Sequence, residues 1–251
     1  MAYYHDFRPV GYLSDTVPDD IFLQLKEKCF QAKNKNISVT KDLAGNIAEE
    51  YQLDIKDEVI SNKLLGFLGY NIIQYQNRYE YNRKILTKDV PYIIDNMWVN
   101  FQKKHEFNPI HVHQGVFSFV IWVNIPYSLE DEFKNKSSIN SNYNVPSIFQ
   151  FTNRDFYGHT AINLMVDKSY EGKMILFPSD MSHCVYPFFT SDEYRISISG
   201  NISLNADINP KPLSLDISKS IPYNTSVNIQ NNDSHSKIQE RRSNPSWCSK
   251  W

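Results

Sequence analysis

The chain has 251 residues and a formal net charge of −2, with 41% hydrophobic and 14% aromatic residues. This length fits one large domain with a sizeable core, and the near-zero charge gives no electrostatic reason to expect a nucleic-acid partner. Three cysteines without paired spacing argue against a disulfide scaffold. Neither a signal-peptide pattern nor a run of about 18 apolar residues is visible, so we expect a soluble protein of the cytoplasm.

The first third of the chain predicts helices. Residues 1–16 are turn-prone, and an acidic pair then opens an apolar pattern at residues 19–30 that fits about three helical turns. A longer pattern with apolar residues at helical spacing runs over residues 56–86. We expect these helices to support a sheet formed by the remainder of the chain.

From residue 92 onward the hydrophobic period changes to two, which is typical of strands. Alternating runs occur at residues 93–101, 117–125, 147–152, 174–177 and 194–202. Helices followed by antiparallel-looking strands predict a mostly β fold, a double-stranded β-helix (jelly roll, cupin-like) buttressed by helices. We divide the chain into an N-terminal helical support region (1–91), a jelly-roll catalytic core (92–205) and a polar C-terminal extension (206–251).

Three histidines stand at the edges of the predicted strands. His111 and His113 precede the run that begins at residue 117, and residues at i and i+2 of an extended chain project to one face. His183 follows the run that ends near residue 178. Three imidazole ligands leave positions open on a metal, as a catalytic rather than a structural site requires. The pattern therefore predicts a catalytic metal site formed by His111, His113 and His183.

The last predicted strand carries a cation. Arg195, Ser197 and Ser199 share one of its faces. Taken singly, these residues have ordinary explanations, because isolated histidines are common on surfaces and in cores and arginines commonly form surface salt bridges. Their order on successive strands favours one combined site. Asp180 offers a carboxylate near His183, although capping of a turn is its more common role.

The order H-x-H, then G-x-x-x-x-F-P-x-x-x-x-H, then R-x-S resembles the 2-oxoglutarate and Fe(II)-dependent oxygenases. It is most similar to an uncharacterised branch found in bacteria and phages, cyanophages included. The matching segments are residues 98–100, 108–113, 118–122, 172–179 and 193–199, together with His183, Val185 and Pro187. The resemblance covers residues 92–205. It implies a dioxygenase that binds Fe(II), uses 2-oxoglutarate as cosubstrate, and hydroxylates a prime substrate with release of succinate and CO2.

The resemblance also implies roles for single residues. His111 and His183 match the two imidazole ligands of the iron, whereas His113 stands where most members have a carboxylate. This departure leaves the metal site one unit more positive. Arg195 matches the residue that grips the far carboxylate of 2-oxoglutarate, and we expect its strand to pair with the one that His183 begins. Further positions implied for cosubstrate binding are Ser197, Asn100, Ser118 and Trp122.

Two other function classes remain open. The first is a phage virion structural or accessory protein that keeps an oxygenase-like jelly roll without turnover, because a fold alone does not establish an activity. The second is a three-His cupin-type metal enzyme that needs no 2-oxoglutarate, which the pair of Arg195 and Ser197 disfavours. For the enzyme we expect a small-molecule or protein side-chain substrate, and neither nucleic acid nor membrane. The polar extension predicts a homo-oligomer or a virion partner, with a location in the host cytoplasm or the virion.

Overall fold

The computed structural model describes residues 11–79, 90–136, 139–140, 142, 144–155 and 158–205, all within one compact unit, Met1–Pro210. The predicted polar extension and the last part of the second predicted helix, from residue 80, lie outside these residues. In the described part of the chain, no helix is long and apolar enough to cross a membrane.

The two longest helical segments form where the apolar periodicity predicts them. α1 (Asp19–Lys35) has acidic residues in its first turn and basic residues in its last, which suits the helix dipole, and it ends at Asn36 in the left-handed conformation. The π-helical segment η2 (Val59–Leu64) continues directly into α2 (Leu65–Tyr79). Shorter helical turns are η1 (Thr40–Asp42), α3 (Leu129–Phe133) and η3 (Lys168–Tyr170).

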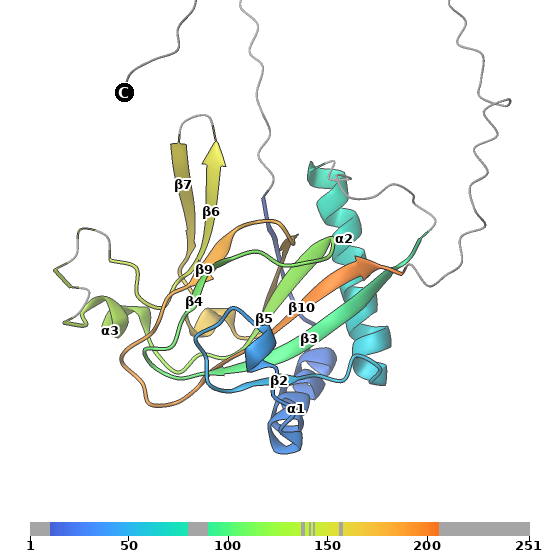
Figure 1. The fold of residues 1–251 in the computed structure, drawn as a ribbon, viewed down its shortest axis with the longest axis horizontal. Helices are drawn as coiled ribbons and strands as arrows, with labels where there is room; N and C mark the ends of the chain where they lie inside the picture. Colours follow the sequence, from blue (N-terminus) through green and yellow to red (C-terminus); the bar gives the residue numbers. More distant parts are fainter. Residues whose placement is uncertain are drawn as a thin grey trace, which may run out of the picture. The chain divides into compact units, whose positions relative to one another are not determined.

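The strands form two antiparallel sheets (Figure 1). The larger sheet has the order β1-β8-β5-β10-β3-β2, and the smaller one has the order β4-β9-β6-β7. The strands of the larger sheet are β1 (Leu13–Thr16), β2 (Glu50–Gln52), β3 (Tyr92–Gln102), β5 (Phe117–Asn124), β8 (Lys173–Pro178) and β10 (Arg195–Leu204). Those of the smaller sheet are β4 (Asn108–His111), β6 (Phe149–Asp155), β7 (Gly158–Leu164) and β9 (His183–Val185).

The strands from β3 to β10 are distributed over the two sheets as in a jelly roll. β3, β5, β8 and β10 form the centre of the larger sheet, the other four form the smaller sheet, and β1 and β2 are edge strands of the larger one. This topology confirms the predicted double-stranded β-helix with supporting helices. The prediction of turns throughout residues 1–16 was wrong for Leu13–Thr16, which pair with β8. Four residues are too few for a period of two to stand out in the sequence.

The first and last strands of the jelly roll lie side by side. β10 pairs with β3 from Arg195 opposite Gln102 to Leu204 opposite Tyr92. Just beyond, the N–H of residue 205 donates to the carbonyl of residue 91 at 2.9 Å. The strands of the core therefore begin and end at one corner of the larger sheet.

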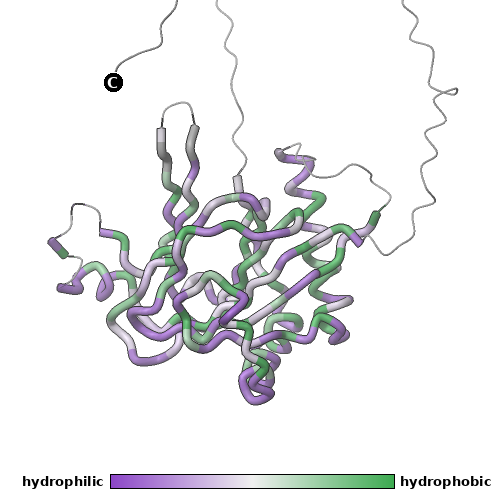
Figure 2. Tube along the Cα trace, in the orientation of Figure 1, coloured by the Kyte–Doolittle hydropathy of each residue, from purple (hydrophilic) through white to green (hydrophobic). Residues whose placement is uncertain are grey.

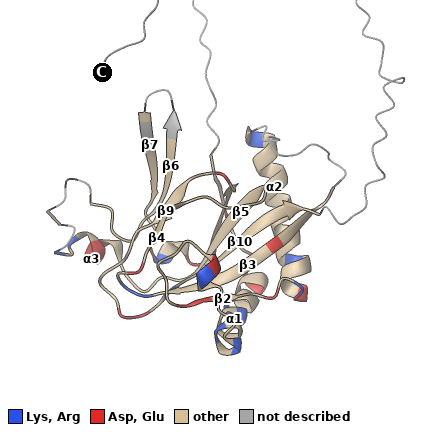
Figure 3. Ribbon diagram, in the orientation of Figure 1, with Lys and Arg blue, Asp and Glu red and all other residues tan. Residues whose placement is uncertain are grey.

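Each face of the larger sheet has its own apolar core. One face packs against α1 and α2, and the other packs against the smaller sheet. In β5, Phe119 and Ile121 belong to the first core, while Val120 and Trp122 belong to the second. Hydrophobic stretches therefore follow α2 and the strands of the larger sheet (Figure 2), and charged residues lie mainly on helices and connecting loops (Figure 3).

Candidate metal centre

Three histidines of the smaller sheet and its connections converge. His111 ends β4 and His183 begins β9, and the two are directly paired in the antiparallel register. His113 is fixed by its backbone N–H, which donates to the carbonyl of Ser179 at 2.8 Å. The candidate ligand atoms of the three side chains all lie within 4.8 Å of one another. The strand spacing thus brings the three imidazoles together as predicted.

Backbone carbonyls orient two of these rings. Nδ1 of His111 lies 2.7 Å from the carbonyl oxygen of Pro109, and Nδ1 of His183 lies 2.9 Å from that of Met181. A carbonyl oxygen only accepts, so each Nδ1 carries the proton and each Nε2 presents a lone pair. Nε2 of His113 lies 3.2 Å from Nε2 of His183. This arrangement of carbonyl-fixed rings with convergent Nε2 atoms is typical of metal-binding histidines.

Burial keeps the three imidazoles neutral. It lowers the pKa of His183 to about 3 and that of His113 to about 4, and it also lowers the pKa of His111. The neutral imidazole is the form that binds a metal, and three nitrogen donors suit a first-row divalent ion such as Fe(II). Within the described residues no carboxylate joins the cluster, and Asp180 is not part of it.

The histidines face a small cavity between the two sheets. Its volume is about 40 Å³, enough for ordered water. Ser118 is not among its lining residues, because its hydroxyl donates to Asn201 Oδ1 at 2.8 Å and lies 3.1 Å from Ser179 Oγ. The other predicted cosubstrate positions do line the cavity, namely Arg195, Ser197, Asn100 and Trp122.

Arg195 is a buried cation whose partners are all neutral. Its side chain donates to Gln102 Oε1 (3.1 and 2.7 Å), the Tyr127 hydroxyl (2.9 Å), and the carbonyls of Ser147 (2.7 Å) and Tyr186 (2.9 Å). Only 3% of Arg195 is exposed, and no carboxylate in the described part of the chain forms an ion pair with it. Because a buried cation without an anion is costly, this position favours an anionic ligand.

The strand that carries Arg195 has other neighbours than predicted. β10 lies between β3 and β5 in the larger sheet, whereas β9, which His183 begins, pairs with β4 and β6 in the smaller one. The chain crosses from one sheet to the other between these two consecutive strands. Arg195 and His183 therefore line the cavity from opposite sheets rather than from paired strands.

One row of cross-strand neighbours forms the floor of the cavity. Ser197 of β10 lies opposite Asn100 on β3 and opposite Trp122 on β5. Nδ2 of Asn100 donates to Ser197 Oγ at 3.2 Å and to Ser199 Oγ at 3.3 Å. Directly opposed residues of antiparallel strands share a face, so the three predicted residues lie together on the cavity side of the larger sheet.

The sequence did not indicate three further residues of the site. Trp98 lines the cavity with its ring centroid 5.8 Å from that of His113. Gln102 is the partner of Arg195, and the period of two from Asn100 places both Trp98 and Gln102 on the cavity face. No comparable signal pointed to Tyr127, because it lies beyond the end of β5.

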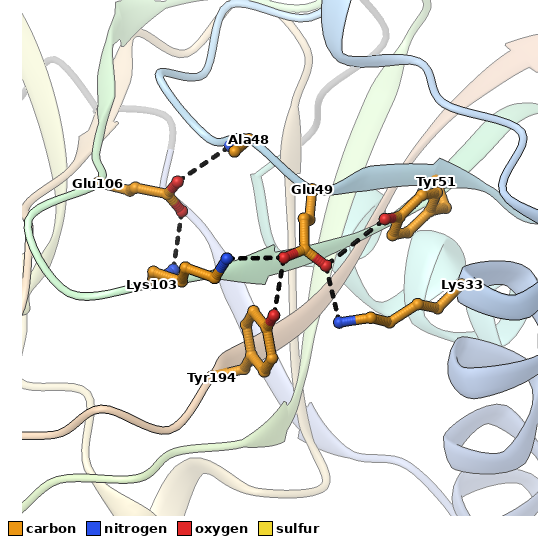
Figure 4. A network of polar contacts seen from close by, with 7 residues as sticks. All are labelled: Lys33, Ala48, Glu49, Tyr51, Lys103, Glu106 and Tyr194. Carbon is orange, nitrogen blue, oxygen red and sulfur yellow. Dashed lines mark hydrogen bonds and ion pairs between the residues drawn. The ribbon is translucent and has the colours of Figure 1, made fainter.

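A polar network around Glu49 includes Tyr194 and Lys103, the chain neighbours of Arg195 and Gln102 (Figure 4). Glu49 accepts from the Tyr194 hydroxyl at 2.7 Å and forms ion pairs with Lys33 at 2.7 Å and Lys103 at 2.8 Å. Partial burial acts to raise the pKa of Glu49, but these partners outweigh it and lower the pKa to about 2. The ionised carboxylate thus links α1 to the ends of β3 and β10 next to Arg195.

Part of the predicted core matches a known protein family. The family described as "Putative 2OG-Fe(II) oxygenase" matches residues 96–201, which include the three histidines and Arg195. This match favours neither of the two alternative classes, which were a virion component without turnover and a three-His cupin-type enzyme. No curated protein matches the chain.

Several solved structures are similar to the chain at low identity. A prolyl-4-hydroxylase from Pseudomonas putida is 12% identical, covering 77% of this chain and 92% of that chain with a TM-score of 0.48. A prolyl hydroxylase from Trichoplax adhaerens, in complex with a hypoxia inducible factor peptide fragment, is 11% identical, covering 78% and 83% with a TM-score of 0.47. A viral collagen prolyl hydroxylase from Paramecium Bursaria Chlorella virus-1, in complex with 2OG, is 12% identical, covering 76% and 94% with a TM-score of 0.44.

Proposed function

We propose that the chain is an Fe(II)- and 2-oxoglutarate-dependent dioxygenase that hydroxylates a prime substrate with release of succinate and CO2, because residues 96–201 match the 2OG-Fe(II) oxygenase family. One observation carries the proposal: the same cavity is lined by three neutral imidazoles and by a buried cation that forms no ion pair within the described residues. When bound, the metal supplies the activation of oxygen, and the protein supplies binding, orientation and electrostatics.

The metal would be held by the Nε2 atoms of His111, His113 and His183. Two of these rings are already fixed by carbonyl groups, so they need no change of tautomer to bind the ion. Their low pKa values mean that no proton has to leave them at neutral pH. Three protein ligands leave positions open for cosubstrate and oxygen.

Arg195 would bind the far carboxylate of 2-oxoglutarate. A carboxylate is a stronger acceptor than a neutral oxygen, so we expect it to take up N–H groups that now donate to Gln102 and Tyr127. A five-carbon diacid also exceeds a cavity of about 40 Å³, so neighbouring side chains must turn when it binds. We assign Ser197, Asn100 and Trp122 to the wall around it, and Ser118 to an indirect role through Asn201.

We propose a small molecule or a protein side chain as the prime substrate. The net charge of −2 does not favour a nucleic acid. Two apolar residues flank the metal ligands on the surface: Ile110 is 65% exposed and Val112 is 56% exposed. They alternate with His111 and His113 and therefore lie on the outer face of this segment, where exposed apolar groups commonly contact a partner.

For the polar segment 206–251 we propose a role outside the catalytic core, such as contact with a second copy of the chain or with a virion partner. The support is its polar composition, with several prolines and no sustained periodicity. We also propose a location in the host cytoplasm or in the virion. The division of the chain after residues 91 and 205 is part of the same proposal.

The test is anaerobic Fe(II) binding followed by succinate formation from 2-oxoglutarate in air. We expect His111→Ala combined with His183→Ala to abolish stoichiometric metal binding and succinate release. His105→Asn is the matched control, because His105 is an exposed histidine outside the cluster with a positive φ that asparagine tolerates. Undiminished metal binding by the double variant would refute the assigned ligands.

A further inference from the structure

Every N–H group of the Arg195 guanidinium already has an acceptor. Nε and one terminal nitrogen donate to Gln102 Oε1, at 3.1 and 2.7 Å. The same terminal nitrogen donates to the carbonyl of Tyr186, and the other one donates to the Tyr127 hydroxyl and to the carbonyl of Ser147. Since a guanidinium has five N–H donors and no acceptor, a cosubstrate can reach Arg195 only by replacing one of these partners.

Gln102 is the partner that stands between Arg195 and the cavity. It lies directly opposite Arg195 in the register of β3 and β10. Of the four partners of Arg195, only Gln102 lines the cavity, whereas Tyr127, Ser147 and Tyr186 hold the other N–H groups away from it. Gln102 Oε1 therefore covers the edge of the guanidinium formed by Nε and one terminal nitrogen. Two neighbouring N–H groups of this kind are what an arginine uses to bind both oxygens of a carboxylate.

The chemistry of its partners fixes the orientation of the Gln102 amide. Nε2 donates to the carbonyl of Glu106 at 2.5 Å, and this carbonyl can only accept. Oε1 faces Arg195, which can only donate. The amide cannot turn over without losing both contacts, and with 4% of the residue exposed there is little access for water to replace them. Gln102 is thus held firmly over the guanidinium.

Gln102 and the cosubstrate cannot occupy this edge together. The cavity volume of about 40 Å³ suffices for ordered water but not for a five-carbon diacid. Gln102 Oε1 lies against the two N–H groups that the far carboxylate would take. An arginine pairs more strongly with a carboxylate than with a neutral oxygen, so an anion gains by the exchange and a neutral group does not. The free energy of removing Gln102 from Arg195 is subtracted from that of cosubstrate binding.

We propose that Gln102 is an internal competitor of 2-oxoglutarate for Arg195, which makes this end of the cavity selective for an anion. The inference rests on the proposed function. It gives Gln102 an effect opposite to that of an ordinary wall residue. A side chain that contacts the bound cosubstrate strengthens binding, whereas a competitor weakens it. The sign of the change in affinity when Gln102 is removed therefore distinguishes the two roles.

The test is a calorimetric titration of the full chain with Mn(II) and then 2-oxoglutarate. Gln102→Ala should bind 2-oxoglutarate about tenfold more tightly than the wild type, the equivalent of one hydrogen bond to a charged group. Arg195 should stay in place in this variant, because its contacts with Tyr127, Ser147 and Tyr186 remain.

Gln102→Glu should have the opposite effect. It places a carboxylate directly opposite Arg195, and this internal ion pair should weaken 2-oxoglutarate binding by about two decades. Both variants should bind Mn(II) as the wild type does, because Gln102 is not part of the histidine cluster. Gln150→Ala is the matched control. Gln150 is also a buried glutamine, but it donates to Asn163 and does not line the cavity, so its removal should leave the affinity unchanged.

The outcomes separate the two proposals. If the wild type binds 2-oxoglutarate in a Mn(II)-dependent way and folded Gln102→Ala binds it no more tightly, Gln102 is not a competitor and the proposed function stands. Wild-type affinity in Gln102→Glu would overturn the inference equally, so the test does not depend on the folding of one variant. If the wild type shows no Mn(II)-dependent binding at millimolar 2-oxoglutarate, the proposed function fails and this inference fails with it.

Discussion

Replacing Glu50 by glutamine measures what a fully buried carboxyl costs the empty protein, since neither of its oxygens has a hydrogen-bond partner within the described residues. Glutamine keeps the shape of the neutral carboxyl but does not ionise. The carboxyl titrates near 4.5 in the unfolded chain, whereas burial raises its pKa to about 8 in the folded chain. Between these pH values the unfolded state loses the proton and the folded state keeps it. The free energy of unfolding of the wild type therefore falls as pH rises from about 4.5 to about 8, and then levels off.

The size of this effect follows from the two pKa values. A difference between 4.5 and about 8 corresponds to about 5 kcal/mol at about 1.4 kcal/mol per pKa unit. At pH 5, which is only slightly above the pKa of this carboxyl in the unfolded chain, about 1 kcal/mol of the cost is present. At pH 9 nearly all of it is present. The stability advantage of Glu50→Gln over the wild type should thus grow by about 4 kcal/mol between pH 5 and pH 9.

Urea unfolding of the metal-free proteins, followed by tryptophan fluorescence at pH 5, 7 and 9, is the appropriate assay. Comparable m values would show that both chains unfold from similarly compact states. Glu130→Gln serves as the control, because its exposed carboxylate should give a small difference from the wild type at every pH. A stability difference between Glu50→Gln and the wild type that does not change with pH would refute the reasoning.

Three further changes have defined outcomes. Arg195→Ala should lose about two to four decades of affinity for 2-oxoglutarate in calorimetry while still binding Mn(II), and Arg195→Lys should recover part of the loss; wild-type affinity in either variant would contradict the assigned carboxylate contact. Glu132→Gln replaces the carboxylate that accepts from the backbone N–H groups of Phe189 and Thr190 by a neutral amide. It should lower the free energy of unfolding in urea by about 1–3 kcal/mol. An unchanged urea midpoint would show that the carboxylate does not stabilise this loop. Truncation after Asn205 should leave Mn(II) binding intact, and an insoluble product would instead make residues 206–251 part of the fold.

The long elements of the fold could be predicted because they show a full hydrophobic period. β3 and β10 alternate over enough residues for a period of two to be visible, and α1 has both a helical pattern and charges suited to its ends. β2 and β9 have three residues each, and β4 has four. Such strands exist because neighbours supply their hydrogen bonds, and that information lies in the pairing rather than in the local sequence.

The same limit applies to the candidate site. The convergence of His111 with His113 follows from spacing along one extended segment, so it could be predicted locally. The contact of Arg195 with Gln102 depends on the register between two strands far apart in the sequence. Glu50 belongs to a strand that the sequence does not show, so neither its burial nor its place beside Asn100 had a local signal.

The corner where β3 begins and β10 ends has a consequence for protein engineering. The chain leaves the jelly roll at residue 205 beside the point where it enters, and Arg195 lies at the far end of the ten-residue strand β10 (Figure 1). At about 3.3 Å per residue this separation is roughly 30 Å. A fluorescent reporter or a surface tether attached after residue 205 would sit remote from the carboxylate-binding end of the cavity. The corner is therefore a suitable attachment point for immobilised binding measurements.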